Sequence, residues 1–170
     1  MIDIEGLATT PDAVILTIAA QSFNPFGKGY YNNRFFYARV TLESQEDRAI
    51  NEATVEWWAT QKEAQLEAFN ENNRISLEDA LDGLHKIAWQ HDFIWANGPT
   101  YDINILEHAY RSKNKKQPWQ YYKIRDARSI YSLYPGLAKP ATSHHALEDC
   151  KRQIDMLQST FKYLNVTEIR

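Results

Sequence analysis

The order of the hydrophobic patterns along this chain predicts an α/β fold, in which a mixed five-stranded sheet carries helices on both faces. Three strand patterns come first, and we expect them to pair as an antiparallel meander. Each of two later strand patterns is followed by a helical pattern, so the sheet should be mixed and not wholly parallel. No internal repeat or linker interrupts the 170 residues, and we expect one domain over 1–170.

Each strand is predicted from a short apolar run bounded by turn residues. The run 13–23 is rich in β-branched residues, which favours a buried strand. The run 34–42 alternates between apolar and polar side chains. The sequence Asn97-Gly98-Pro99 ends a later run. The predicted strands span 1–5, 13–23, 34–42, 92–97 and 121–125.

Apolar residues at helical spacing predict the remaining elements. Ser76 and Asp79 are typical of a helix start, and apolar residues follow them at intervals of three and four. The last helical pattern carries its apolar residues in one stripe. The predicted helices span 51–70, 102–111, 126–134 and 146–164, with a further one that begins at Ser76, and 112–118 and 136–144 are predicted loops.

The composition is that of a soluble globular protein, with 44% hydrophobic and 24% charged residues. The net charge of -3 provides no overall positive field for nucleic acid, so such binding would need a local basic patch or metal ions. The lone Cys150 excludes an intramolecular disulfide and fits a reducing compartment. Because no apolar run is long enough to cross a membrane and the start lacks a signal-peptide pattern, we expect a cytoplasmic protein with no membrane partner.

Four carboxylates stand at the ends of predicted elements. Asp3 and Glu5 are two residues apart on a strand, so both project from one face. Asp102 follows a strand, and Asp149 lies in the first turns of the last helix. Acids on one buried face repel one another unless a cation lies between them, and Mg²⁺ or Mn²⁺ prefers such oxygen ligands. A pair of metal ions about 3.5–4 Å apart needs three or four carboxylates, which is the number present.

A two-metal hydrolysis also needs a base for the attacking water, and His144, just before the last helix, is suited to that role. Each residue alone has a simpler explanation. Asp-x-Glu is common, Asp102 could cap its helix, and His144 and Asp149 could be a loop histidine and a solvated acid. The joint occurrence of all five residues in this order favours the metal site.

The same residues carry a resemblance to a known family. The segments 3–7, 97–102 and 144–149 resemble the three motifs of the DEDD exonuclease superfamily, in its His-containing (DEDDh) branch with a ribonuclease H-like fold. The segments 50–61 and 125–128 resemble a phage and bacterial subgroup that includes phage exonuclease A and a mycobacterial exoribonuclease.

The resemblance implies a role for each motif residue. It implies that Asp3, Glu5 and Asp149 bind one divalent ion, that Asp3 and Asp102 bind the other, and that His144 is the general base. His145 is an adjacent competitor, but the motif register favours His144. Gly6 departs from the hydroxyl residue usual after the Glu, which puts a minor substrate contact in doubt.

Further residues are candidates for substrate binding. Neighbouring Trp57 and Trp58 cannot share one narrow helix face, so one is expected in the core and the other against a base, unless both are core. Leu7 is either a wedge against the terminal base or a buried anchor. Asn97 and Tyr101 are expected either to position Asp102 or the phosphate, or to serve the turn and the packing.

The basic residues concentrate in one part of the chain. Arg125 and Arg128 are candidates for phosphate contacts, although a solvated surface is the usual meaning of such a run. The concentration comprises Lys113, Lys115, Lys116, Lys123, Arg125 and Arg128.

The residue pattern predicts a metal-dependent phosphodiester hydrolase with two Mg²⁺ or Mn²⁺ ions, and the resemblance implies a 3′-5′ exonuclease that releases nucleoside 5′-monophosphates from single-stranded ends. The phage-like Trp57-Trp58 segment tilts the expected substrate slightly toward DNA. The alternatives are an exoribonuclease or short-oligonucleotide hydrolase, a silent nucleic-acid-binding module of the same fold, and a structural protein with fortuitous acids. The excess of aromatic residues would also permit a homodimer interface.

Overall fold

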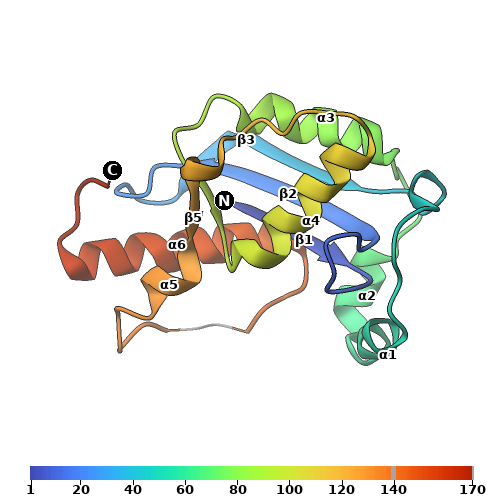
Figure 1. The fold of residues 1–170 in the computed structure, drawn as a ribbon. Helices are drawn as coiled ribbons and strands as arrows, with labels where there is room; N and C mark the ends of the chain where they lie inside the picture. Colours follow the sequence, from blue (N-terminus) through green and yellow to red (C-terminus); the bar gives the residue numbers. More distant parts are fainter. Residues whose placement is uncertain (139–140, 170) are drawn as a thin grey trace.

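The computed structural model describes residues 1–138 and 141–169. A five-stranded sheet in the order β3-β2-β1-β4-β5 forms its centre (Figure 1). The α/β class and the mixed sheet predicted from the sequence are thereby confirmed. The strands are β1 (Ile2–Gly6), β2 (Ile15–Phe23), β3 (Tyr30–Arg39), β4 (Ile94–Ala96) and β5 (Ile124–Asp126).

The pairing of the strands places β1 in the middle of the sheet. β2 lies antiparallel to both β1 and β3, as the predicted meander requires. β4 runs parallel to β1, and β5 runs parallel to β4. The carboxyl ends of β1, β4 and β5 therefore meet at one edge of the sheet, where α/β proteins place their ligand groups.

Helices cover both faces of the sheet (Figure 1). α3 and α4 pack on one face, and α5 and α6 pack on the other. The helices are α1 (Glu52–Thr60), α2 (Lys62–Ala68), α3 (Leu77–Ala88), α4 (Pro99–Ser112), α5 (Ala127–Tyr131) and α6 (Ala146–Leu164).

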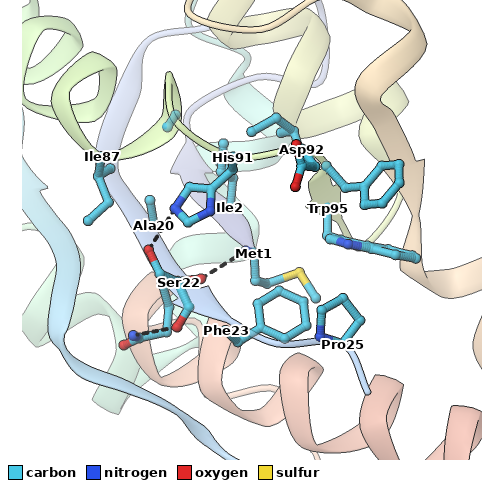
Figure 2. Close-up of a pocket in the computed structure, with 14 residues that line it drawn as sticks. Met1, Ile2, Ala20, Ser22, Phe23, Pro25, Ile87, His91, Asp92 and Trp95 are labelled. Atoms are coloured by element: carbon cyan, nitrogen blue, oxygen red, sulfur yellow. Dashed lines mark hydrogen bonds between the residues drawn. The ribbon is translucent and has the colours of Figure 1, made fainter. Parts of the chain in front are cut away.

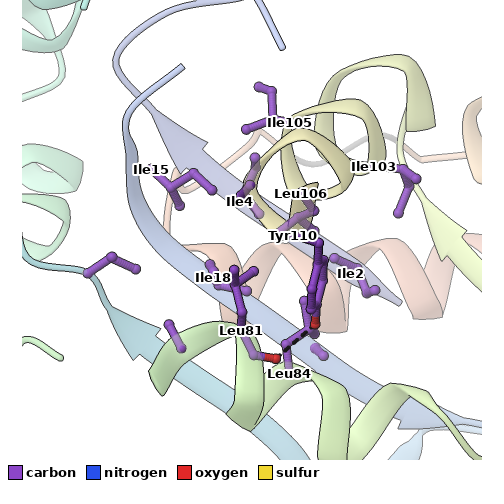
Figure 3. Packing of buried hydrophobic residues seen from close by; sticks show 14 of the residues in the cluster. Ile2, Ile4, Ile15, Ile18, Leu81, Leu84, Ile103, Ile105, Leu106 and Tyr110 are labelled. Atoms are coloured by element: carbon purple, nitrogen blue, oxygen red, sulfur yellow. Dashed lines mark hydrogen bonds between the residues drawn. The ribbon is translucent and has the colours of Figure 1, made fainter. Parts of the chain in front are cut away.

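The alternation of side chains along β1 separates the core from the carboxylates. Ile2 and Ile4 are buried against Leu106 and Tyr110 of α4 and the leucines of α3 (Figure 3). Since successive side chains of a strand point to opposite faces, Asp3 and Glu5 project toward α6. Burial of this apolar surface supplies the driving force that holds two acids on a central strand.

The structure corrects several predicted boundaries, including the following. The helix expected over 51–70 is broken at Gln61, where the backbone leaves the helical region (φ -96°, ψ 61°) and separates α1 from α2. α4 begins at Pro99 rather than Asp102, because Gly98 takes φ 100° and lets the chain turn directly from β4 into the helix. β3 begins at Tyr30 rather than residue 34. β5 covers only 124–126 of the strand region, with a 3₁₀ turn before it.

Two residues of the predicted 136–144 loop, 139 and 140, lie outside the described residues. Within the described part of the chain, no helix has both the length and the apolar character that crossing a membrane requires.

Gly83 of α3 lies directly against the ring of Phe36 on β3. A Cβ atom at this position would lie 2.2 Å from Cε2 of the Phe36 ring. Gly→Ala in a helix normally stabilises by about 0.5–1 kcal/mol, but here we expect Gly83→Ala to lower the free energy of unfolding by roughly 1–3 kcal/mol through overpacking. Chemical denaturation measures this change. Gly83→Ala combined with Phe36→Leu should recover part of the loss, and a stabilised single variant would contradict the packing argument.

Candidate active site

The carboxylates converge from three elements. Asp3 and Glu5 project from β1, Asp102 lies in the first turn of α4, and Asp149 lies in the first turn of α6. Glu5, Asp102 and Asp149 are all buried. The three sequence motifs, which are about 100 and 45 residues apart in the chain, are thus brought to the carboxyl edge of β1.

Asp102 is fixed by the backbone of the central strand. Its Oδ1 accepts a hydrogen bond of 3.2 Å from the N–H of Ile4. This bond joins the start of α4 to β1. The other carboxylate oxygen of Asp102, Oδ2, does not take part in it. Asp102 does not cap its helix, because the N-cap position is Gly98.

Asp149 is held by a clamp of donors from the loop that precedes α6. Its Oδ1 accepts hydrogen bonds from the backbone N–H (3.0 Å) and the hydroxyl (2.9 Å) of Ser143. Its Oδ2 accepts from the backbone N–H of His144 at 3.1 Å and from the hydroxyl of Thr142. Arg152 lies 3.3 Å away as an ion-pair partner. Although burial favours the neutral acid, these bonds hold the pKa of Asp149 below its ordinary value, so it is ionised at neutral pH.

The other three acids have pKa values above their ordinary range. Burial, reinforced by neighbouring carboxylates, raises the pKa of Asp3 to about 7 and that of Glu5 to about 9. Burial and the charge of Asp3 also raise the pKa of Asp102 well above its ordinary value. The folded chain therefore concentrates acids whose negative charges are costly unless positive charge is supplied nearby.

His144 faces this acidic group. It adopts a left-handed backbone conformation (φ 53°), and its Nδ1 lies 3.9 Å from Oε1 of Glu5. Partial burial lowers its pKa, so the imidazole is neutral at pH 7. The adjacent His145 points elsewhere, because its ring stacks on Tyr37 and its Nε2 lies 3.9 Å from Glu67.

One of the two tryptophans is buried and the other is exposed, which is the first of the two predicted alternatives. Trp58 is 1% exposed, and its indole N–H donates to the carbonyl of Gly6 at 3.0 Å. Trp57 is 39% exposed, and its ring meets the edge of His144 at a centroid separation of 4.8 Å. Core packing for both residues is therefore wrong, and the exposed aromatic ring at the site belongs to Trp57.

Leu7 is placed as a loop anchor. Its side chain is 4% exposed and packs in the small core around Trp58. Neither Leu7 nor Trp58 can reach a base without unpacking this cluster. The expected base contacts of these two residues are therefore wrong.

The remaining substrate candidates lie around the same edge. The Tyr101 hydroxyl lies 3.1 Å from the point where a Cβ of Gly6 would be, and the Val14 carbonyl lies 3.0 Å from that point. This crowding explains the glycine after Glu5. The guanidinium of Arg128 donates to the carbonyl of Asn97 at 2.9 Å. Arg125 lies farther back on β5, with its guanidinium 4.5 Å from the centre of the Phe93 ring.

The donor set fits a divalent metal ion. Ligand atoms of Glu5, His144 and Asp149 lie within 4.8 Å of one another. The side-chain oxygen Oε1 of Gln153 is buried beside Asp3 without a hydrogen-bond partner among the described residues. Buried carboxylate oxygens and an unpaired amide oxygen together suit Mg²⁺ or Mn²⁺ and their bound water.

Comparison with known proteins agrees with this geometry. The Rv2179c-like family model, described as a 3′-5′ exoribonuclease Rv2179c-like domain, matches residues 1–161. The chain belongs to this family. Membership supports a nuclease that acts on nucleic acid, and the resemblance to the subgroup with the mycobacterial exoribonuclease is confirmed. No curated protein gives a significant match to the chain.

This Rv2179c-like domain contains a residue that the sequence patterns did not reveal. Gln153 is buried one helical turn after Asp149, and its Nε2 donates to Oδ1 of Asp3 at 2.7 Å. The signal was a polar residue four positions after an acid, inside an otherwise apolar helix face. The donor clamp of Thr142 and Ser143 was also missed, because its geometry depends on a loop conformation.

We expect Gln153→Met to weaken Mn²⁺ binding by this Rv2179c-like domain about 10-fold or more, since groups that orient metal ligands commonly contribute that much. Titration of the thermal midpoint with Mn²⁺ measures the change. Gln158→Met is the matched control, because Gln158 is a buried glutamine on the same helix that bonds to Asn24 and Gly29 instead. Equal Mn²⁺ responses in the two variants would contradict a role for Gln153 at the metal site.

A separate small cavity lies away from the carboxylates. It has a volume of about 130 Å³ and is lined by Met1, Phe23 and Trp95, among others. Figure 2 shows His91 at its wall, where Nε2 lies 2.9 Å from the Ser22 hydroxyl. Because Met1 and Ile2 line this cavity at the start of β1, it lies at the opposite end of the strand from Glu5.

Proposed function

We propose that this chain is a metal-dependent 3′-5′ exoribonuclease that removes nucleoside 5′-monophosphates from single-stranded RNA ends. The observation that carries the proposal is the convergence of Asp3, Glu5, Asp102, Asp149 and His144 at one edge of the sheet. The description of the matching family supports the same activity.

The residues divide into two metal positions that share Asp3. Asp3, Glu5 and Asp149 would hold one ion, and Asp3 and Asp102 would hold the other. Two ions held by these residues would supply Lewis acidity, which would offset the charge of the phosphodiester and lower the pKa of the attacking water. Gln153 keeps one oxygen of Asp3 in place, and the Ser143 and Thr142 donors keep Asp149 charged.

His144 is the proposed general base. Its Nδ1 faces Glu5, and the imidazole is neutral at pH 7, so this nitrogen can take a proton from the attacking water. The water oxygen forms a bond to phosphorus while the bond from phosphorus to the 3′ oxygen of the preceding nucleotide breaks. Trp57 packs against the His144 ring and restricts its orientation.

Trp57 is also the proposed stacking surface for a base near the 3′ end. Its exposed ring borders His144, and stacking of a base on an aromatic ring is tolerant of base identity. Tyr101 lies beside Gly6 and Arg128 donates to the carbonyl of Asn97, and both are proposed to contact the terminal nucleotide and its phosphate.

The proposed substrate is RNA rather than the DNA toward which the Trp57-Trp58 segment tilts the sequence argument. The family description names an exoribonuclease, and an indole that stacks on a base has no preference between the two sugars.

The test uses two 5′-labelled single strands of one sequence, one RNA and one DNA, with Mn²⁺. The wild-type chain is expected to shorten the RNA from its 3′ end, and Asp102→Asn is expected not to. The Asn side chain retains an oxygen that can accept the Ile4 N–H bond, so this variant should remain folded. Metal-dependent binding without shortening would overturn the proposal in favour of a binding module, and faster shortening of DNA would overturn the choice of RNA.

A further inference from the structure

The basic residues of this acidic chain are concentrated in one segment, which includes the edge strand β5. Residues 111–128 hold seven of the 19 Lys and Arg residues and one of the 22 Asp and Glu residues. The rest of the chain is therefore strongly acidic. A polyanion such as RNA would be attracted to segment 111–128 and repelled by most of the remaining surface.

The last part of this segment, 121–128, includes β5, which is an edge strand of the sheet (Figure 1). At one end, the guanidinium of Arg128 donates to the carbonyl of Asn97, five residues before Asp102. At the other end, the 3₁₀ turn Tyr121–Lys123 leads into the strand. At a rise of about 3.3 Å per residue, the three residues of β5 separate this turn from the carboxyl end of the strand by roughly 10 Å.

The far end presents two exposed aromatic rings. Tyr121 is 82% exposed and Tyr122 is 60% exposed. Their centroids are 5.5 Å apart with an interplanar angle of 83°, so the two rings present differently oriented surfaces. The ammonium group of Lys123 follows directly and donates to the carbonyl of His91 at 3.1 Å. Exposed rings next to cations are typical of surfaces that bind single strands without sequence preference.

We propose that the segment 121–128 is a track for the 5′ part of the RNA strand. Arg128 lies at the catalytic end, Arg125 and Lys123 attract the phosphates along β5, and Tyr121 and Tyr122 stack on bases several nucleotides from the 3′ end. The track makes the chain prefer strands long enough to reach the tyrosine pair. This inference rests on the proposed function, because it concerns the same substrate.

The test compares RNA strands of two lengths. Binding of a 5′-fluorescent 12-mer and of a dinucleotide is measured by anisotropy in an Asp102→Asn background, which prevents hydrolysis. We expect Tyr121→Ala with Tyr122→Ala to weaken binding of the 12-mer about 10-fold or more, since stacking contributes at least that factor. The ratio of 12-mer to dinucleotide affinity should fall by the same factor.

Matched variants separate the track from a general effect on the fold. Tyr31→Ala with Arg34→Gln removes an exposed aromatic–cation pair (5.8 Å) from β3, the opposite edge strand, and should leave the ratio unchanged. Tyr121→Phe with Tyr122→Phe keeps the rings and should retain 12-mer binding. A ratio that stays constant in the Ala variant, or that falls equally in the β3 variant, would overturn the track. Failure of the otherwise unsubstituted chain to shorten either RNA with Mn²⁺ would instead overturn the proposed function.

Discussion

Replacing Asp3 with Asn is expected to reduce the rate of RNA hydrolysis by roughly 10³-fold, because one charged ligand shared by both proposed ions contributes several kcal/mol. The same variant should be more stable without metal. At pH 8 the wild-type Asp3 is forced to carry its charge in a buried, acidic environment that raises its pKa to about 7. A neutral Asn removes that cost, so we expect the free energy of unfolding to rise by roughly 1–3 kcal/mol.

Thermal unfolding with and without Mn²⁺ measures both effects together with the activity. The wild type should gain stability with Mn²⁺, and Asp3→Asn should gain little. Asn can still accept the hydrogen bond from Gln153, which keeps the local packing intact. Asp155→Asn is the control, since Asp155 is an exposed acid of α6 outside the group of four carboxylates and should leave the activity and the gain in stability with Mn²⁺ unchanged. A fully active Asp3→Asn, or one less stable than the wild type without metal, would contradict the assignment.

Replacing His144 with Asn is expected to lower kcat by about 10²–10⁴-fold, the range typical of a lost general base. Asn tolerates the left-handed backbone that His144 adopts, so the loop and its N–H bond to Asp149 should persist. The stabilisation by Mn²⁺ should therefore remain while catalysis is lost, and this separates a base from a metal ligand.

His145→Asn provides the comparison for this experiment. His145 is the N-cap residue of α6, a position that Asn favours, and its ring faces Tyr37 and Glu67. We expect a change in kcat well below tenfold. Equal losses in the two variants would show that the loop conformation, and not the His144 imidazole, controls the rate. Loss of Mn²⁺ stabilisation in His144→Asn would make His144 a metal ligand instead.

Most of the fold could be predicted from local sequence patterns. The alternation in β1, the β-branched run of β2 and the apolar stripe of α6 depend on which faces are buried, and hydrophobic periodicity reports this directly. The breaks at Gln61 and Gly98 were harder to predict, because backbone conformation there depends on how adjacent elements pack. The same is true of the early start of β3, which its pairing with β2 decides.

The sequence by itself determined the α/β class and the family, and it predicted the four acids and His144 as the site, because residue type and order carry this information. Only the tertiary structure decided that Trp57 borders His144 while Trp58 is buried, that Gln153 bonds to Asp3, and that a loop clamps Asp149. It also decided that β5 and the residues after it bring Arg125 and Arg128 to the side of β4, whose carboxyl end lies near the acids. Periodicity specifies which face of an element is apolar, whereas contacts among polar groups depend on distances that exist only after the elements have packed.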